Sequence, residues 1–111
     1  MPFHVHPLPA LAWEPGAHPL EKKRVSAGGY LVQLRFEPGF EDPNRCVTGH
    51  TLVVLEGVLH LVGDRETVAV PAGQVCVVEQ GTGHRACNRG SEPLVLLAIQ
   101  HELCAANGAP R

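Results

Sequence analysis

Short apolar runs separated by glycine and proline constrain this chain more than any other feature of its sequence. Between Tyr30 and Ile99 the apolar residues alternate with polar ones or form brief runs, and no window shows the helical period. Strands are therefore predicted over residues 30–36, 51–55, 58–62, 67–70, 75–78, 85–87 and 94–99, with a loop over 88–93. Such spacing is typical of an all-β sandwich or barrel, and the pattern alone does not choose between them.

Length and charge exclude several classes of protein. A chain of 111 residues is expected to form a single domain, 1–111. Its net charge of −2 supplies no basic surface for nucleic acid. No apolar stretch approaches the roughly 18 residues of a membrane span, and the proline-rich N-terminus lacks the basic start of a signal peptide. We therefore expect a cytoplasmic protein that binds neither nucleic acid nor membrane, with four reduced cysteines: Cys46, Cys76, Cys87 and Cys104.

The most specific motif lies between Gly73 and Asn88. Glycines there allow tight turns on either side of a short apolar run, and His84 begins the strand that follows. The spacing of Gly73, Gly81, His84 and Asn88 resembles the second conserved motif of the cupin superfamily, with Glu79 where the family has proline. The resemblance implies an all-β, double-stranded β-helix (cupin or jelly-roll) barrel, and His84 stands at a position that binds metal in the family.

The resemblance extends over most of the chain, roughly Val32 to Gln100. Val53–Gly57 resembles the hairpin that closes the first cupin motif, and Val70–Gly73 resembles the turn before the second. The chain is thus identified as a small single-domain, RmlC-like cupin with a degraded first motif. Its expected parts are an N-terminal arm over 1–24, a barrel over 25–101 and a C-terminal tail over 102–111.

The N-terminal arm contains five prolines. We expect Trp13 and Leu20 to pack it onto the barrel, and Lys22–Arg24 to be a solvated loop. The apolar last strand, Leu94–Ile99, and this arm need more cover than a small barrel provides. In many small cupins the N-terminal strand crosses to a partner subunit, so the resemblance also implies a homodimer.

A candidate metal site follows from the resemblance. Counting back from Gly57, the ligand positions of the first motif fall on Asn44, Cys46 and His50. The implied ligands are His84, His50 and Cys46, with Asn44 as a marginal fourth. Strand alternation places residues 46 and 50 on one face, unless Gly49 introduces a bulge. Further pocket residues are expected at the following positions: Asn44, Leu52, Val54 and Asn88.

The chemistry of this set leaves two alternatives open. One thiolate and two imidazoles suit zinc, and a single divalent ion (Zn, Ni, Fe or Mn) is the expected cofactor. Glu79 is a further candidate carboxylate, although it lies in a turn. The alternative is a barrel without metal, because the family's two histidines and glutamate are missing from the first motif. Cys46 would then be an ordinary buried thiol and His50 a polar residue bonded to a carbonyl.

Two functions from different classes fit these observations. The first is a stand-alone cupin that binds a small-molecule ligand in the barrel, through a divalent metal held by His50 and His84. The alternative is a metal-dependent enzyme, namely a dioxygenase, isomerase or lyase acting on a small oxygenated substrate. A structural dimer without ligand is a third, weaker option.

Overall fold

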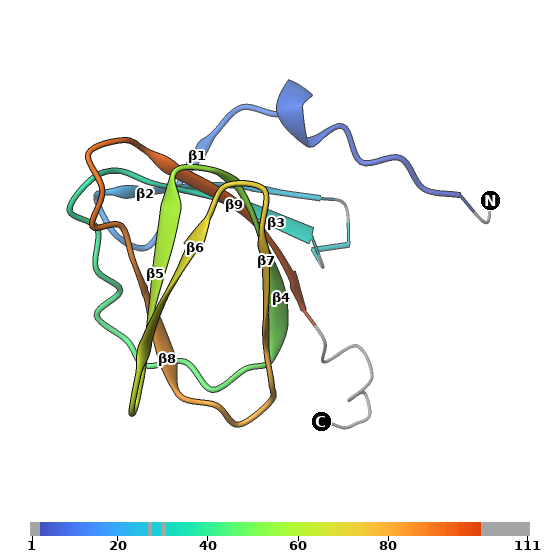
Figure 1. Cartoon of the computed structure of the whole chain (residues 1–111). Coiled ribbons are helices and arrows are strands. Elements are labelled where there is room, and N and C mark those ends of the chain that lie inside the picture. The colour runs from blue at the N-terminus through green and yellow to red at the C-terminus, as the bar shows by residue number, and fades with distance from the viewer. Residues whose placement is uncertain (1–2, 27, 30, 101–111) are drawn as a thin grey trace.

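The computed structural model describes residues 3–26, 28–29 and 31–100, and these form strands almost throughout (Figure 1). The only helical element in this part of the chain is a short 3-10 turn, Leu8–Ala10. The strands run in the following order: β1 (Glu14–Pro15), β2 (Glu21–Val25), β3 (Leu31–Phe36), β4 (His50–Glu56), β5 (Val58–Gly63), β6 (Thr67–Pro71), β7 (Val75–Val78), β8 (His84–Cys87) and β9 (Leu94–Gln100). The predicted strands are confirmed, with ends that differ by a residue or so.

The strands form two antiparallel sheets that face each other. The larger has the order β1-β2-β3-β9-β4-β7, and the smaller has the order β6-β5-β8. Figure 1 shows the two sheets enclosing the interior of the barrel. The expected all-β barrel is therefore confirmed.

The predicted hairpin at Val53–Gly57 is wrong, because the chain passes from one sheet to the other there. β4 pairs with β7 and β9, whereas β5 pairs with β6 and β8. Gly57 makes this crossing with a φ of +79°, and a Cβ at this position would approach the Pro93 carbonyl oxygen to 2.6 Å. Glycine is thus required both by the backbone conformation and by the close approach of another segment.

The core lies between the sheets and follows from strand alternation. In β4, Leu52 and Val54 point inward, and β5 contributes Leu59 and Leu61 in the same way. The chain from Phe36 to Phe40 adds two aromatic rings that stack with centroids 4.0 Å apart. The full cluster is Phe36, Phe40, Leu52, Val54, Leu59, Leu61, Val70, Val78, Leu94, Leu96 and Ala98.

The N-terminal arm is attached through a strand, not through the expected loop. Lys22–Arg24 lies within β2, whose backbone pairs with both β1 and β3. The guanidinium of Arg24 lies 3.9 Å from the centre of the Trp13 ring. It also donates three hydrogen bonds to arm carbonyls, those of Leu8, Pro9 and Leu11. The charged composition of Lys22–Arg24 suggested a solvated loop, but pairing with β1 and β3 satisfies the backbone hydrogen bonds of this segment. The several N–H donors of Arg24 attach the arm to it.

The last strand also differs from expectation in its surroundings. β9 lies at the centre of the larger sheet, between β3 and β4. Its residues Leu94, Val95 and Leu96 are buried within the chain itself. The apolar strand is therefore covered within one subunit, so it gives no reason to expect a homodimer. In the described part of the chain, no helix has the length and apolar character needed to cross a membrane.

Candidate metal and ligand site

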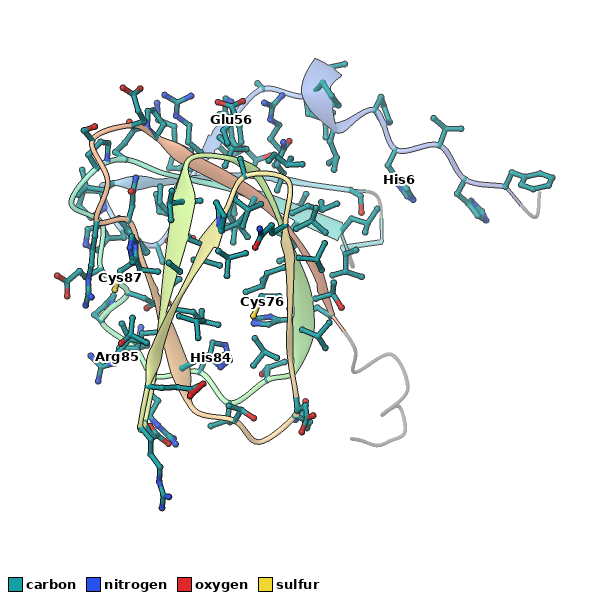
Figure 2. The ribbon with its side chains drawn as sticks, in the orientation of Figure 1. His6, Glu56, Cys76, His84, Arg85 and Cys87 are labelled. Carbon is teal, nitrogen blue, oxygen red and sulfur yellow. The ribbon has the colours of Figure 1, made fainter. Side chains whose placement is uncertain are left out.

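Two histidines from different sheets meet inside the barrel. His50 begins β4 and His84 begins β8, and their Nε2 atoms lie 3.1 Å apart. His50 points inward because it shares a face of β4 with Leu52 and Val54. His84 is 5% exposed, and Figure 2 shows it directed into the space between the sheets.

The backbone carbonyl of Thr82 fixes the orientation of the His84 ring. The His84 Nδ1 atom lies 2.8 Å from this oxygen, so Nδ1 carries the proton and donates it. The lone pair of Nε2 is thereby directed at His50. In a metal-binding imidazole, a hydrogen bond from the other ring nitrogen to a carbonyl sets both the tautomer and the direction of the ring.

The segment that contains Cys46 lies directly against β8. The Cys46 N–H donates to the His84 carbonyl at 2.8 Å, and the His84 N–H donates to the Cys46 carbonyl at 2.9 Å. The Cys46 Sγ accepts a hydrogen bond from the Thr48 N–H at 3.4 Å. Cys46 lines the same cavity as the two histidines. Among the described residues, however, no three His, Cys, Asp or Glu side chains are grouped closely enough to hold a metal on their own.

An ion pair crosses the turn that precedes His84. Arg45 donates two hydrogen bonds to the Asp64 carboxylate, at 2.9 and 2.6 Å. The Arg45 guanidinium lies so close over Gly83 that a Cβ there would overlap it. These bonds lower the pKa of Asp64 and raise that of Arg45. The pair joins the segment before β4 to the turn after β5, directly over the backbone that carries His84.

A cavity of about 140 Å³ lies between the sheets beside the histidine pair. Leu52 lines it, as predicted, together with Phe36 and Phe40. The histidines and Cys46 thus form a polar group in a largely apolar chamber.

The other three expected pocket residues lie elsewhere. Asn44 is exposed, in a turn where its N–H donates to Asp42 Oδ1. Val54 packs in the core, away from the cavity wall. Asn88 is only 1% exposed, and its Nδ2 donates to the carbonyls of Phe36 and Glu92 while its Oδ1 accepts from the Gly90 N–H. Asn88 therefore has a structural role, because its amide is hydrogen-bonded to backbone groups of three residues.

Glu79 does not join the histidines, because it lies exposed in the turn after β7. Three of the cysteines, Cys46, Cys76 and Cys87, are free thiols, and burial raises the pKa of the last two. Cys104 lies outside the described residues. The sequence offered no signal for the role of Thr82, because its backbone carbonyl accepts the His84 hydrogen bond and every residue has such a carbonyl. Gly83, next to a candidate ligand, was the one available sign of a close approach.

The histidine pair fits one metal ion. With metal–nitrogen bonds of about 2.0–2.1 Å, two nitrogens on the same ion lie about 2.8–3.0 Å apart at right angles and about 3.3–3.4 Å apart in a tetrahedron. The observed separation of 3.1 Å falls within this range. Two protein ligands leave further coordination positions for Cys46, water or an oxygen-bearing molecule.

Comparison with solved structures places the fold among known barrels. A polyketide cyclase, RemF of Streptomyces resistomycificus, has a TM-score of 0.72 and 19% identity over 90% of this chain and 79% of its own. A predicted oxalate decarboxylase of Thermotoga maritima has a TM-score of 0.70 and 16% identity over 87% of this chain and 99% of its own. Drosophila melanogaster CENP-C, in a structure bound to CAL1, has a TM-score of 0.71 and 18% identity over 86% of this chain and 79% of its own.

These identities are low, so the likeness concerns the fold alone. None of the curated proteins that were compared matches the sequence significantly. The family model of the cupin domain (Cupin_2) matches residues 33–100, which is more than half of the chain and includes both histidines. The chain therefore belongs to the cupin family.

Proposed function

We propose that this protein binds a small molecule inside the barrel, at a divalent ion held by His50 and His84. The observation that carries the proposal is the 3.1 Å approach of the two Nε2 atoms, with the tautomer of His84 set by Thr82. The cavity beside the pair supplies the space for a ligand.

Cys46 is the proposed third metal ligand. It lies on the cavity wall, and its backbone is bonded to that of His84. A thiolate and two imidazoles favour zinc over harder ions, and nickel, iron and manganese follow as candidates. When bound, such an ion would polarise an oxygen of the ligand. The protein's own part is to orient His84 through the Thr82 carbonyl and to surround the ion with largely apolar walls.

A metal-dependent enzyme is the second candidate. Its support is that two of the similar structures are described as a polyketide cyclase and a predicted oxalate decarboxylase. The proposed chemistry is that of a dioxygenase, isomerase or lyase on a small oxygenated substrate. Turnover of a bound ligand by the metal-loaded protein, lost in His84→Ala, would favour the enzyme over the binding protein.

A homodimer is also proposed, on new grounds. β7 is an edge strand of the larger sheet, and its residues Val75 and Val77 are 56% and 61% exposed. In the arm, Phe3 and Val5 are exposed as well. Apolar residues on a sheet edge favour association. Sedimentation at micromolar concentration should show twice the 11.9 kDa chain mass, and a purely monomeric species would contradict the proposal.

The free thiols support a cytoplasmic location.

The metal proposal is tested by the elemental content of protein purified without a histidine tag, after growth with Zn, Ni, Fe and Mn supplied. We expect one ion per chain in the wild type and none in His84→Ala or His50→Ala. His60→Ala is the matched control, because His60 lies between the inward-facing Leu59 and Leu61 and so points to the opposite face of β5.

Equal metal content in the wild type and in His84→Ala would show that this pair is not the site. If no preparation contains metal, the metal-free binding protein remains as the alternative. The role of Cys46 has its own readout, since cobalt substitution should give a thiolate charge-transfer band that disappears in Cys46→Ser.

A further inference from the structure

We infer that the barrel cavity selects an uncharged ligand of about the size of benzene, with a single oxygen or nitrogen donor directed at the histidine pair. This inference names the ligand class of the site proposed above and rests on the proposal that the pair binds a ligand. It is carried by the volume of the cavity, by its walls and by the placement of charge around it.

The volume sets the size of the ligand. The cavity measures about 140 Å³. An engineered apolar protein cavity of about 150 Å³ takes up benzene. A single six-membered ring with one substituent atom therefore fills the available space, whereas a two-ring molecule exceeds it.

The walls set the polarity of the ligand's body. Phe36 and Phe40 stack on each other at one side, and side chains of β4, β5 and β9 complete the chamber. Nine of the lining residues are apolar: Leu34, Phe36, Phe40, Leu52, Leu59, Leu61, Ala86, Leu96 and Ala98. A polar group placed against these walls would lose its hydrogen bonds to water without replacement, which disfavours its binding. The body of the ligand is therefore apolar.

The charges around the cavity disfavour an anion. Two carboxylates, Glu21 and Asp42, are among its lining residues. Within the described residues the lining includes a single cationic side chain, that of Arg85. Arg85 is exposed, and as the neighbour of His84 on β8 it is directed to the other side of the strand (Figure 2). Among the described lining residues, a phosphate or a carboxylate on the ligand would meet no buried cationic side chain, so the proposed metal ion would be its only counter-charge.

The histidine pair sets the position of the one polar atom. The Nε2 of His84 carries a lone pair, because its Nδ1–H is bonded to Thr82. Without a metal, this lone pair accepts from His50 Nε2 at 3.1 Å. A metal held between the two nitrogens would bind this lone pair and the oxygen of a ligand hydroxyl. One donor atom at the edge of the ring is then enough, and the rest of the ligand lies against Leu52 and the phenylalanines.

The test uses calorimetric titration of the purified protein with three probes: phenol, 1-naphthol and phenyl phosphate. Phenol should bind, and the other two should bind at least about tenfold more weakly, because one is too large and the other is charged. Ala98→Leu should reduce phenol affinity by at least about tenfold, because residue 98 lies on the cavity wall. Ala69→Leu is the matched control, since Ala69 is exposed on β6, and it should bind phenol as the wild type does. If Ala98→Leu does not fold, Ala98→Val makes the same test with a smaller side chain.

Phenyl phosphate binding as tightly as phenol, or phenol binding unchanged in a folded Ala98 variant, would overturn the inference. The metal measurement separates this failure from failure of the proposed function. Ala98→Leu keeps both histidines, so it should retain the wild-type metal content. Loss of metal in His84→Ala, together with no binding of phenol to the wild type, would leave the metal site standing and reject the ligand class.

Discussion

Replacement of Asn88 by alanine should destabilise the fold strongly. The Asn88 amide makes three hydrogen bonds, donating to Phe36 O and Glu92 O at 2.9 Å each and accepting from Gly90 N at 3.0 Å. At about 1 kcal/mol per bond, with the Phe36 carbonyl left unsatisfied in the interior, the loss is about 3 kcal/mol. For a domain of this length, that loss should lower Tm by about 12 °C.

Thermal and urea unfolding followed by circular dichroism measure this change. Asn44→Ala is the matched control, because Asn44 is exposed and its backbone N–H, not its amide, is bonded to Asp42; it should change stability by less than about 0.5 kcal/mol. Asn88→Asp should be at least as harmful as alanine at neutral pH, because a carboxylate oxygen would then face two carbonyls. A loss below about 1 kcal/mol for Asn88→Ala, or loss of metal at unchanged stability, would refute the structural role of this residue.

Two further substitutions test the core and the turn before His84. Leu59→Ala should lower the free energy of unfolding by about 2–5 kcal/mol, because Leu59 is fully buried between the sheets. Leu55→Ala should lower it far less, because the Leu55 side chain is 46% exposed. Equal urea midpoints for the two variants would contradict the assignment of the core. Gly83→Ala should displace the Arg45 guanidinium and break its pair with Asp64, so its effect should vanish in an Arg45→Ala background. The folded-state pKa of Asp64 is lowered. The stabilisation from the Arg45–Asp64 pair is therefore present above the unfolded-state pKa and is lost as the pH falls through the lowered value. Additive effects of Gly83→Ala and Arg45→Ala on the urea midpoint would contradict a contact between Gly83 and Arg45.

Much of the fold can be predicted from the sequence, because alternation determines which face of a strand is apolar. The runs that became β3 to β9 were recognisable, with their glycine turns. Alternation also placed residues 46 and 50 on one face, and the spacing that resembles the cupin motifs marked His50 and His84 as inward-facing. These properties depend on neighbours a few residues apart in the chain, and such local information is fully contained in the sequence.

The partners of each strand were decided only by the tertiary structure. Alternation is the same for any partner strand, so it could not reveal that β4 and β5 belong to different sheets or that β9 lies at the centre of the larger one. Nor could it show that the charged segment Lys22–Arg24 is a sheet strand that holds the arm. Strand pairing joins segments far apart in sequence, and the stabilisation comes from backbone bonds that are not specific to residue type.

The site divides in the same way. The sequence by itself indicated His50 and His84 as candidate ligands, through the spacing that resembles the cupin motifs. Only the tertiary structure brought their Nε2 atoms to a separation of 3.1 Å and oriented the His84 ring through the Thr82 carbonyl. It also placed the Asn88 amide where it bonds the Phe36 carbonyl. Every residue has a backbone carbonyl. Which group a given carbonyl bonds therefore depends on the path of the chain and not on the side chain of that residue.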